Sequence, residues 1–230
     1  MENKNIMVVG CHPDDIEMGM GGTVLLLLDK GYSVTLVDLT NGEPTPHGTV
    51  EKRMAEAECA RQKFGGPKRI TMDMPNRFLE DSIENRKKLA AVIRQVRPSI
   101  IFCQWWVDYH PDHKVAHSLV EAARFYAKLV KSDIPGEPFY PSRIFYYFAS
   151  HARVQMDISF IMDITPYFDK KIDVISCYES QLANRPISHI VDTIGSMNKY
   201  FGGLGRCLYG EPFHSREPLM LSDIKDLGIP

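Results

Sequence analysis

The chain has 230 residues, of which 44% are hydrophobic and 24% charged, with a net charge of −2. These values are ordinary for a globular protein, and we expect residues 1–230 to form one domain. The balance of charge gives no reason to expect nucleic acid or an anionic membrane as a partner. The longest apolar run, Val24 to Leu28, is too short to span a bilayer, and residues 1–5 do not begin a signal peptide. We therefore expect no membrane association.

Apolar runs and turn residues alternate along the chain and predict its elements in order. Strands are predicted at 6–9, 33–39, 68–72, 99–103, 143–148 and 159–164. Helices are predicted at 24–30, 50–64, 82–97 with Ser82 as its cap, 114–131, 166–182 and 187–201. This alternation predicts an α/β fold with a doubly wound, mostly parallel sheet flanked by helices. The last thirty residues show no periodic pattern, and we expect them to be irregular.

The cysteines are dispersed along the chain. They are Cys11, Cys59, Cys103, Cys177 and Cys207, and no two form a CxxC pair. An odd, scattered set predicts reduced thiols and a cytoplasmic location. Cys11 either supports a metal site from behind or is simply a small buried side chain.

Two clusters of histidine and aspartate follow predicted strands. His12-Pro13-Asp14-Asp15 follows Ile6–Gly10 after a single residue, and His110-Pro111-Asp112-His113 comes soon after Ser99–Cys103. The carboxyl ends of parallel strands meet at one edge of a sheet, which is where ligands bind in open α/β folds. Imidazole and carboxylate groups suit a catalytic zinc, which takes three protein ligands and a water. The clusters offer more groups than zinc needs, and the surplus can serve as a base and an oxyanion donor.

A glycine-rich segment, Gly19-Met20-Gly21-Gly22, lies between the first cluster and the predicted helix. It does not fit the GxGxxG pattern of a dinucleotide site, and nine residues separate it from the strand. We expect these glycines to permit close packing of a helix on the sheet.

The two clusters in this order resemble the PIG-L/LmbE-type zinc-dependent N-acetylglucosaminyl deacetylases, in particular their bacillithiol-pathway branch. Further matching segments run in the same order: Asp38–Glu43, Arg53 with Glu56, Met74–Arg77, Tyr178–Gln181 and Tyr209–Phe213. The resemblance therefore covers nearly the whole chain. It implies a Rossmann-like fold without a dinucleotide and a homo-oligomer, such as a hexamer. The substrate would be a small N-acetylated amino sugar, such as an N-acetylglucosaminyl malate or a chito-oligosaccharide, which loses its acetyl group.

The resemblance also implies roles for individual residues. His12, Asp15 and His113 would bind Zn²⁺, although Fe²⁺ or Co²⁺ can occupy such ligands. Asp14 would be the general base, and His110 would stabilise the oxyanion or protonate the leaving amine. The substrate would contact Arg53 and Asn76. Arg77, next to Asn76, is a further candidate for substrate binding or else a solvated loop charge. Asn76 replaces a frequent aspartate of the family, which affects the expected sugar contact.

Several alternatives are left open by the residues themselves. Two histidines and one carboxylate also form the site of non-haem iron oxygenases, but Asp14 as an extra base favours hydrolysis. A metal-binding or ligand-binding module on the same fold is a second alternative. Arg53 either clamps an anion or pairs at the surface with Glu56. Trp105 and Trp106 either wall the pocket or pack in the core.

Overall fold

The computed structural model describes residues 4–149, 155–183 and 187–222. The strands are β1 (Asn5–Gly10), β2 (Ser33–Thr40), β3 (Lys68–Met74), β4 (Ile100–Gln104), β5 (Arg143–Tyr147), β6 (Phe160–Asp163) and β7 (Gly210–His214). The helices are α1 (Asp15–Asp29), α2 (Val50–Phe64), α3 (Ile83–Val96), α4 (Pro111–Ala127), α5 (Phe168–Ile175), α6 (Glu179–Leu182) and α7 (Ile187–Gly205), with a 3₁₀ turn at Thr165–Tyr167. None of the helices in the described ranges has the length and hydrophobicity of a membrane span.

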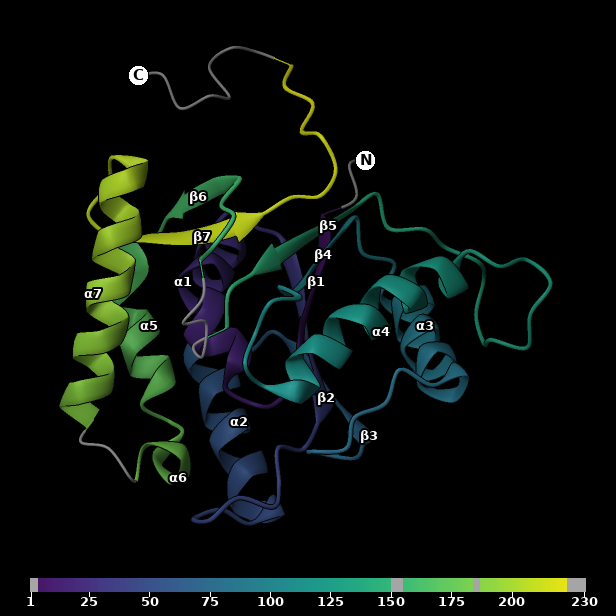
Figure 1. The fold of residues 1–230 in the computed structure, drawn as a ribbon, viewed down its shortest axis with the longest axis horizontal. Coiled ribbons are helices and arrows are strands. Elements are labelled where there is room, and N and C mark those ends of the chain that lie inside the picture. The colour runs from purple at the N-terminus through teal and green to yellow at the C-terminus, as the bar shows by residue number, and fades with distance from the viewer. Residues whose placement is uncertain (1–3, 150–154, 184–186, 223–230) are drawn as a thin grey trace.

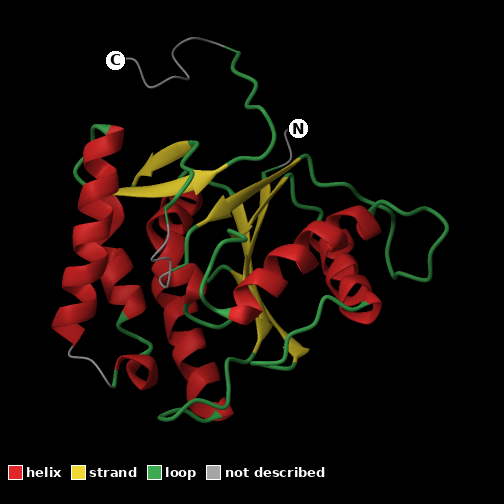
Figure 2. Cartoon of the chain, in the orientation of Figure 1, coloured by secondary structure: helices red, strands yellow, loops and turns green. Residues whose placement is uncertain are grey.

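One seven-stranded sheet organises the fold, in the order β3-β2-β1-β4-β5-β7-β6 (Figures 1 and 2). The strands from β3 to β5 pair in parallel, as predicted. β7 runs antiparallel to both β5 and β6. The strand order reverses direction between β1 and β4, which makes a Rossmann-like sheet with its switch point between these two strands.

Helices cover both faces of the sheet. Successive side chains of a strand point to opposite faces, and apolar side chains on each face need a layer of helices to bury them. Met7 and Val9 of β1 pack on the face covered by α3 and α4. Ile6 and Val8 point to the opposite face, where they meet α1, α2 and α5. Figure 1 shows these two groups of helices on either side of the strands. Burial on both faces explains why β1 reads as a continuous apolar run.

α1 begins at Asp15, much earlier than the predicted start at residue 24. The prediction started the helix after the glycines, but they lie inside it. A Cβ atom on Gly19 would come within 2.5 Å of the Tyr147 ring, and one on Gly22 within 2.7 Å of Ile164. Close packing therefore accounts for these glycines, as predicted. α1 is kinked at Met20, whose φ of −147° is not helical.

The prediction of an irregular C-terminal segment is wrong for β7, which is completely buried in the sheet. Pro212 concealed the strand because proline cannot donate to a sheet ladder. Glu211 gives β7 a structural role. Its carboxylate accepts hydrogen bonds from the backbone N–H groups of Gly22 and Thr23, at 3.0 and 2.7 Å, just after the kink in α1. Lys171 of α5 balances the buried charge at 2.7 Å.

Two further helix predictions need correction. α4 begins at Pro111 rather than residue 114, so the second cluster forms its first turn. The predicted helix at 166–182 is divided into the 3₁₀ turn, α5 and α6. Tyr178 interrupts it with φ −88° and ψ 57°, and the Tyr178 hydroxyl donates to Glu17 of α1 at 2.8 Å. The interruption of the helical pattern thus coincides with a tertiary hydrogen bond.

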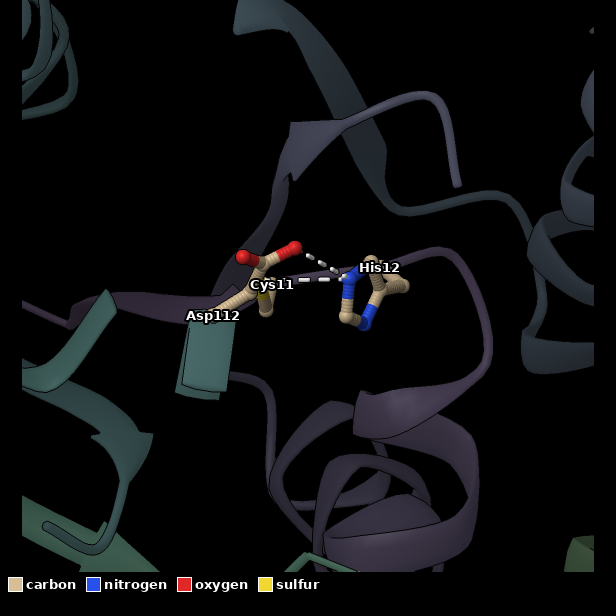
Figure 3. Close-up of side chains that lie close together, drawn as sticks. All are labelled: Cys11, His12 and Asp112. Carbon is tan, nitrogen blue, oxygen red and sulfur yellow. Dashed lines mark hydrogen bonds and ion pairs between the residues drawn. The ribbon is translucent and has the colours of Figure 1, made fainter. Parts of the chain in front are cut away.

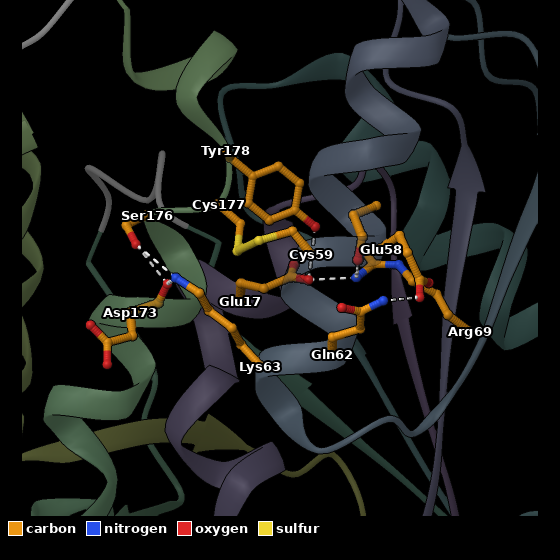
Figure 4. The surroundings of a disulfide bond; sticks show 11 residues. Glu17, Glu58, Cys59, Gln62, Lys63, Arg69, Asp173, Ser176, Cys177 and Tyr178 are labelled. Carbon is orange, nitrogen blue, oxygen red and sulfur yellow. Dashed lines mark hydrogen bonds and ion pairs between the residues drawn. A yellow bond between two sulfur atoms is a disulfide. The ribbon is translucent and has the colours of Figure 1, made fainter.

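The prediction of reduced thiols is wrong for one pair. Cys59 of α2 forms a disulfide with Cys177, 118 residues further along the chain (Figure 4). The other cysteines, Cys11, Cys103 and Cys207, are unpaired thiols. Their dispersion hid the pair, because spacing along the chain does not show which cysteines meet in the fold. Cysteine spacing therefore gives no support for a reducing compartment.

Removing this disulfide is expected to lower the free energy of unfolding by about 2–4 kcal/mol, because a long covalent loop restricts the unfolded chain. The Cys59→Ala/Cys177→Ala double variant tests this in urea unfolding, with Cys207→Ser as the matched control. Dithiothreitol should destabilise the wild type and leave the double variant unchanged. A denatured, unreduced wild type in which every cysteine reacts as a thiol would contradict the pairing.

Candidate metal centre

The two clusters meet at the switch point of the sheet. β1 and β4 are adjacent and parallel, and Ile6 pairs with Ile100. The chain leaves β1 through Cys11–Asp15 into α1, and it leaves β4 through a short loop into α4. Both clusters therefore reach the crevice outside the carboxyl ends of the strands, as the strand pattern predicted.

Three donor groups converge there. His12 Nδ1 lies 3.4 Å from His113 Nε2, and His113 Nε2 lies 3.3 Å from Asp15 Oδ1. All three residues are buried, and their ligand atoms lie within 4.8 Å of one another. A tetrahedral Zn²⁺ with bonds of about 2.0–2.1 Å holds neighbouring donors about 3.3–3.4 Å apart. The donor set and its spacing thus fit a divalent metal such as zinc.

Each of the three donors has a polar partner behind it. Asp108 Oδ2 lies 3.0 Å from His113 Nδ1, and Asp112 Oδ2 lies 3.4 Å from His12 Nε2. Gln104 Nε2 donates to Asp15 Oδ2 at 2.7 Å. Sequence reasoning did not single out Asp108 or Gln104. The available signal was that Gln104 is a polar residue at the end of a buried strand and that Asp108 lies in the short loop that follows it.

Asp14 lies beside this triad but is not part of it. Its backbone φ of 132° is strained for a residue with a side chain, and strain of this kind costs about 1–3 kcal/mol. The turn lets successive carboxylates face different partners, Asp15 toward the histidines and Asp14 toward Arg53, whose Nη2 lies 3.1 Å away. Burial raises the pKa of the Asp14 carboxyl to about 6, and the Arg53 charge opposes the rise. Asp14 is therefore a carboxylate suited to proton transfer near neutral pH.

His110 is the N-cap of α4 and lies against both histidines of the triad. Its ring centroid is 4.8 Å from that of His12 and 4.7 Å from that of His113. The Asp112 N–H donates to His110 Nδ1 at 3.3 Å, so the proton of the neutral ring is on Nε2. Burial, together with the nearby histidine charges, lowers the pKa of His110 to about 4. The neutral ring can thus act as a hydrogen-bond donor.

Cys11 forms a second group of metal-binding side chains with His12 and Asp112 (Figure 3). Its Sγ atom lies 3.5 Å from His12 Nε2. Burial raises the pKa of the Cys11 thiol to about 12. Since the thiolate is the form that binds metals, this group is a poorer metal site than the triad. Cys11 also packs in the core beneath α3 and α4, so both of its expected environments are present.

The expected substrate contacts differ in their surroundings. Arg53 is only 2% exposed, and its Nε and Nη1 atoms form no hydrogen bond within the described residues. It does not pair with Glu56, which instead accepts from Ser180 N and Oγ at 2.7 Å each. Arg77 is exposed, and its backbone N–H donates to Asp112 at 2.7 Å. Asn76 is half-buried in the same loop.

Both tryptophans pack against other aromatic side chains. The Trp105 ring lies 4.8 Å from Phe148, and the Trp106 ring lies 5.3 Å from His117 and 5.5 Å from Tyr146. Both belong to or border the core under α4. This arrangement agrees with the packing alternative.

Fold and site together define a Rossmann-like α/β protein with a histidine–aspartate centre at the switch point. A family model described as PIG-L, GlcNAc-PI de-N-acetylase, matches residues 7–124. The chain belongs to this family, as its motifs predicted.

Individual relatives differ in activity. Diacetylchitobiose deacetylase of Thermococcus kodakarensis is 29% identical over 193 residues, which are 77% of this chain and 70% of the relative. The 4-oxalmesaconate hydratase of Pseudomonas putida is 28% identical over 195 residues, covering 77% of this chain and 74% of the relative. The crystal structure of the conserved protein TT1542 from Thermus thermophilus matches with a TM-score of 0.87 and 34% identity, covering 94% of this chain and 96% of that one.

Proposed function

We propose that this protein is a metal-dependent hydrolase that removes the acetyl group from a small N-acetylglucosamine-type substrate. The observation that carries the proposal is the placement of Asp14, a carboxylate outside the donor triad, directly beside it. The pairing of a metal centre with an independent base suits hydrolysis. The relationship to diacetylchitobiose deacetylase supports the choice of an N-acetyl sugar.

His12, Asp15 and His113 would hold the metal, Zn²⁺ in our proposal and Fe²⁺ or Co²⁺ as substitutes. A bound zinc would polarise the acetamide carbonyl and lower the pKa of its water to about 7. Asp14 accepts the proton of the attacking water, while Arg53 holds the Asp14 carboxylate in place.

His110 would stabilise the charge that develops on the carbonyl oxygen. Its Nε2–H donates to the carbonyl oxygen as negative charge develops there. Attack forms a C–O bond, and collapse breaks the C–N bond. The proton taken up by Asp14 passes to the departing nitrogen, which releases acetate and a free amine.

The substrate side of the proposal rests on Arg53. Its buried Nε and Nη1 atoms could each donate to a hydroxyl or carboxylate oxygen of the sugar or its aglycone. Asn76 and Arg77 lie on the loop that reaches Asp112 and would contact the same substrate. A homo-oligomer such as a hexamer, a cytoplasmic location and a single domain over residues 1–230 stay predictions.

The test is release of primary amine from free N-acetylglucosamine, N-acetylglucosaminyl malate and diacetylchitobiose, before and after removal of metal. Amine release that is lost on stripping and restored by Zn²⁺ would support the proposal and identify the aglycone. Hydration of 4-oxalmesaconate without any amine release would instead assign the chain to the chemistry of its Pseudomonas relative. Turnover that needs O₂ and an oxidisable cosubstrate would favour the iron oxygenase alternative.

A further inference from the structure

Gln104 ends β4 and is 1% exposed, at the point where the strand reaches the metal centre. Its Nε2 atom donates to Asp15 Oδ2 at 2.7 Å, and the backbone N–H of His12 donates to the same oxygen at 2.8 Å. The other oxygen, Oδ1, lies 3.3 Å from His113 Nε2. Oδ2 also lies 3.4 Å from His12 Nδ1, but it already accepts from two donors, so Oδ1 is the oxygen left to face a metal.

We propose that Gln104 is a positioning residue that fixes the rotation of the Asp15 carboxylate, so that Oδ1 is presented to the metal. This inference rests on the metal centre of the proposed function. Gln104 acts through Asp15 and needs no contact with the substrate. A metal ligand that is held from behind loses less freedom on binding, which is why such outer partners strengthen metal sites.

The chemistry of the amide suits this position. Only the Nε2 end of Gln104 can face a carboxylate oxygen at 2.7 Å, because the Oε1 end would place two acceptors together. Glutamine also donates without adding a positive charge. A lysine or arginine here would neutralise Asp15 and weaken its attraction for a divalent cation, whereas a glutamine leaves that charge in place.

The contact also joins the two halves of the site. Asp15 begins α1 after β1, whereas His113 lies on α4 after β4. Gln104 and Asp15 are 89 positions apart in the chain. Their hydrogen bond ties the ligand of the first cluster to the strand that leads to the second. Gln104 thus sets the position of Asp15 relative to His113.

The test is the zinc dissociation constant of the metal-stripped protein, measured by competition with a chromogenic chelator. Gln104→Met keeps the length of the side chain but removes the donor. We expect zinc binding to weaken about 10–100-fold, the usual loss when an outer partner of a metal ligand is removed. The visible spectrum of the Co²⁺-loaded variant should also change, because the Asp15 carboxylate is then able to rotate. Cys103→Ala, at the adjacent buried position of β4, is the matched control and should leave both readouts unchanged.

Unchanged zinc affinity and an unchanged cobalt spectrum in a folded Gln104→Met protein would overturn the inference. Should the metal-free Gln104→Met protein melt far below the wild type, Gln104→Asn decides by the same criteria, since it keeps a neutral amide but is one methylene shorter, which moves the donor away from Asp15 Oδ2. The outcome is separable from that of the proposed function. A wild type that binds zinc but releases no amine would refute the proposed deacetylase function. The ratio of the zinc affinities of variant and wild type would still test the positioning role of Gln104.

Discussion

Replacing Asp14 with asparagine is expected to lower kcat by about 10²–10⁴-fold, the usual contribution of a general base, while zinc stays bound. The carboxylate faces Arg53 rather than the histidines, so its loss removes the proton acceptor and leaves the donor triad intact. Asparagine is preferred over alanine because it keeps the shape of the aspartate side chain and replaces only the carboxylate with a neutral amide. The measurements are kcat on the best substrate of the panel and zinc content per chain.

A matched control separates this effect from a general change of charge. Asp133 is an exposed aspartate that pairs with Lys87 at 2.7 Å, far from the site in sequence and on another loop. Asp133→Asn should retain wild-type turnover, because exposed ion pairs contribute little. Wild-type kcat in Asp14→Asn would show that Asp14 is not the base. Loss of zinc together with activity would instead point to a role for Asp14 in binding the metal.

Replacing His113 with alanine is expected to abolish both metal binding and turnover. The change removes one of three donors from a centre in which His12 Nδ1, Asp15 Oδ1 and His113 Nε2 converge. The zinc affinity should fall by more than the about 10–100-fold typical of an outer partner. Equilibrium dialysis against a buffered zinc solution measures the loss directly, and added zinc should not restore activity at concentrations that saturate the wild type.

His117 provides the control because it is buried on α4, one helical turn beyond His113. It packs against Trp106 and Tyr146 rather than the triad. His117→Ala should keep zinc in stoichiometric amounts, whatever its effect on stability. A His113→Ala protein that binds zinc with wild-type affinity would remove His113 from the ligand set.

Local sequence patterns were sufficient to predict most of the fold. β1 and β4 are mostly apolar runs buried on both faces, and a run of this kind can be recognised from the sequence alone. α2 has the predicted bounds, Val50–Phe64, because Thr49 caps its start and Gly65 ends it with a φ of 104°. The alternation of strands and helices then determines the handed, parallel arrangement and places both histidine clusters at one edge of the sheet. The sequence analysis missed elements whose limits depend on distant contacts. β7 is an example, because Pro212 made its segment unlike a strand.

The sequence by itself therefore determined the fold class, the family and the meeting of the two His–Asp clusters. The spacing of the motif residues and the succession of strands and helices along the chain are local properties. Only the tertiary structure decided the contacts across it. The partner of Cys59 lies 118 residues away, and the donor behind Asp15 lies 89 residues away. Arg53 faces Asp14 instead of Glu56 because the packing of α2 on the sheet turns it inward. Such pairings depend on how separate elements pack together, which no local pattern records.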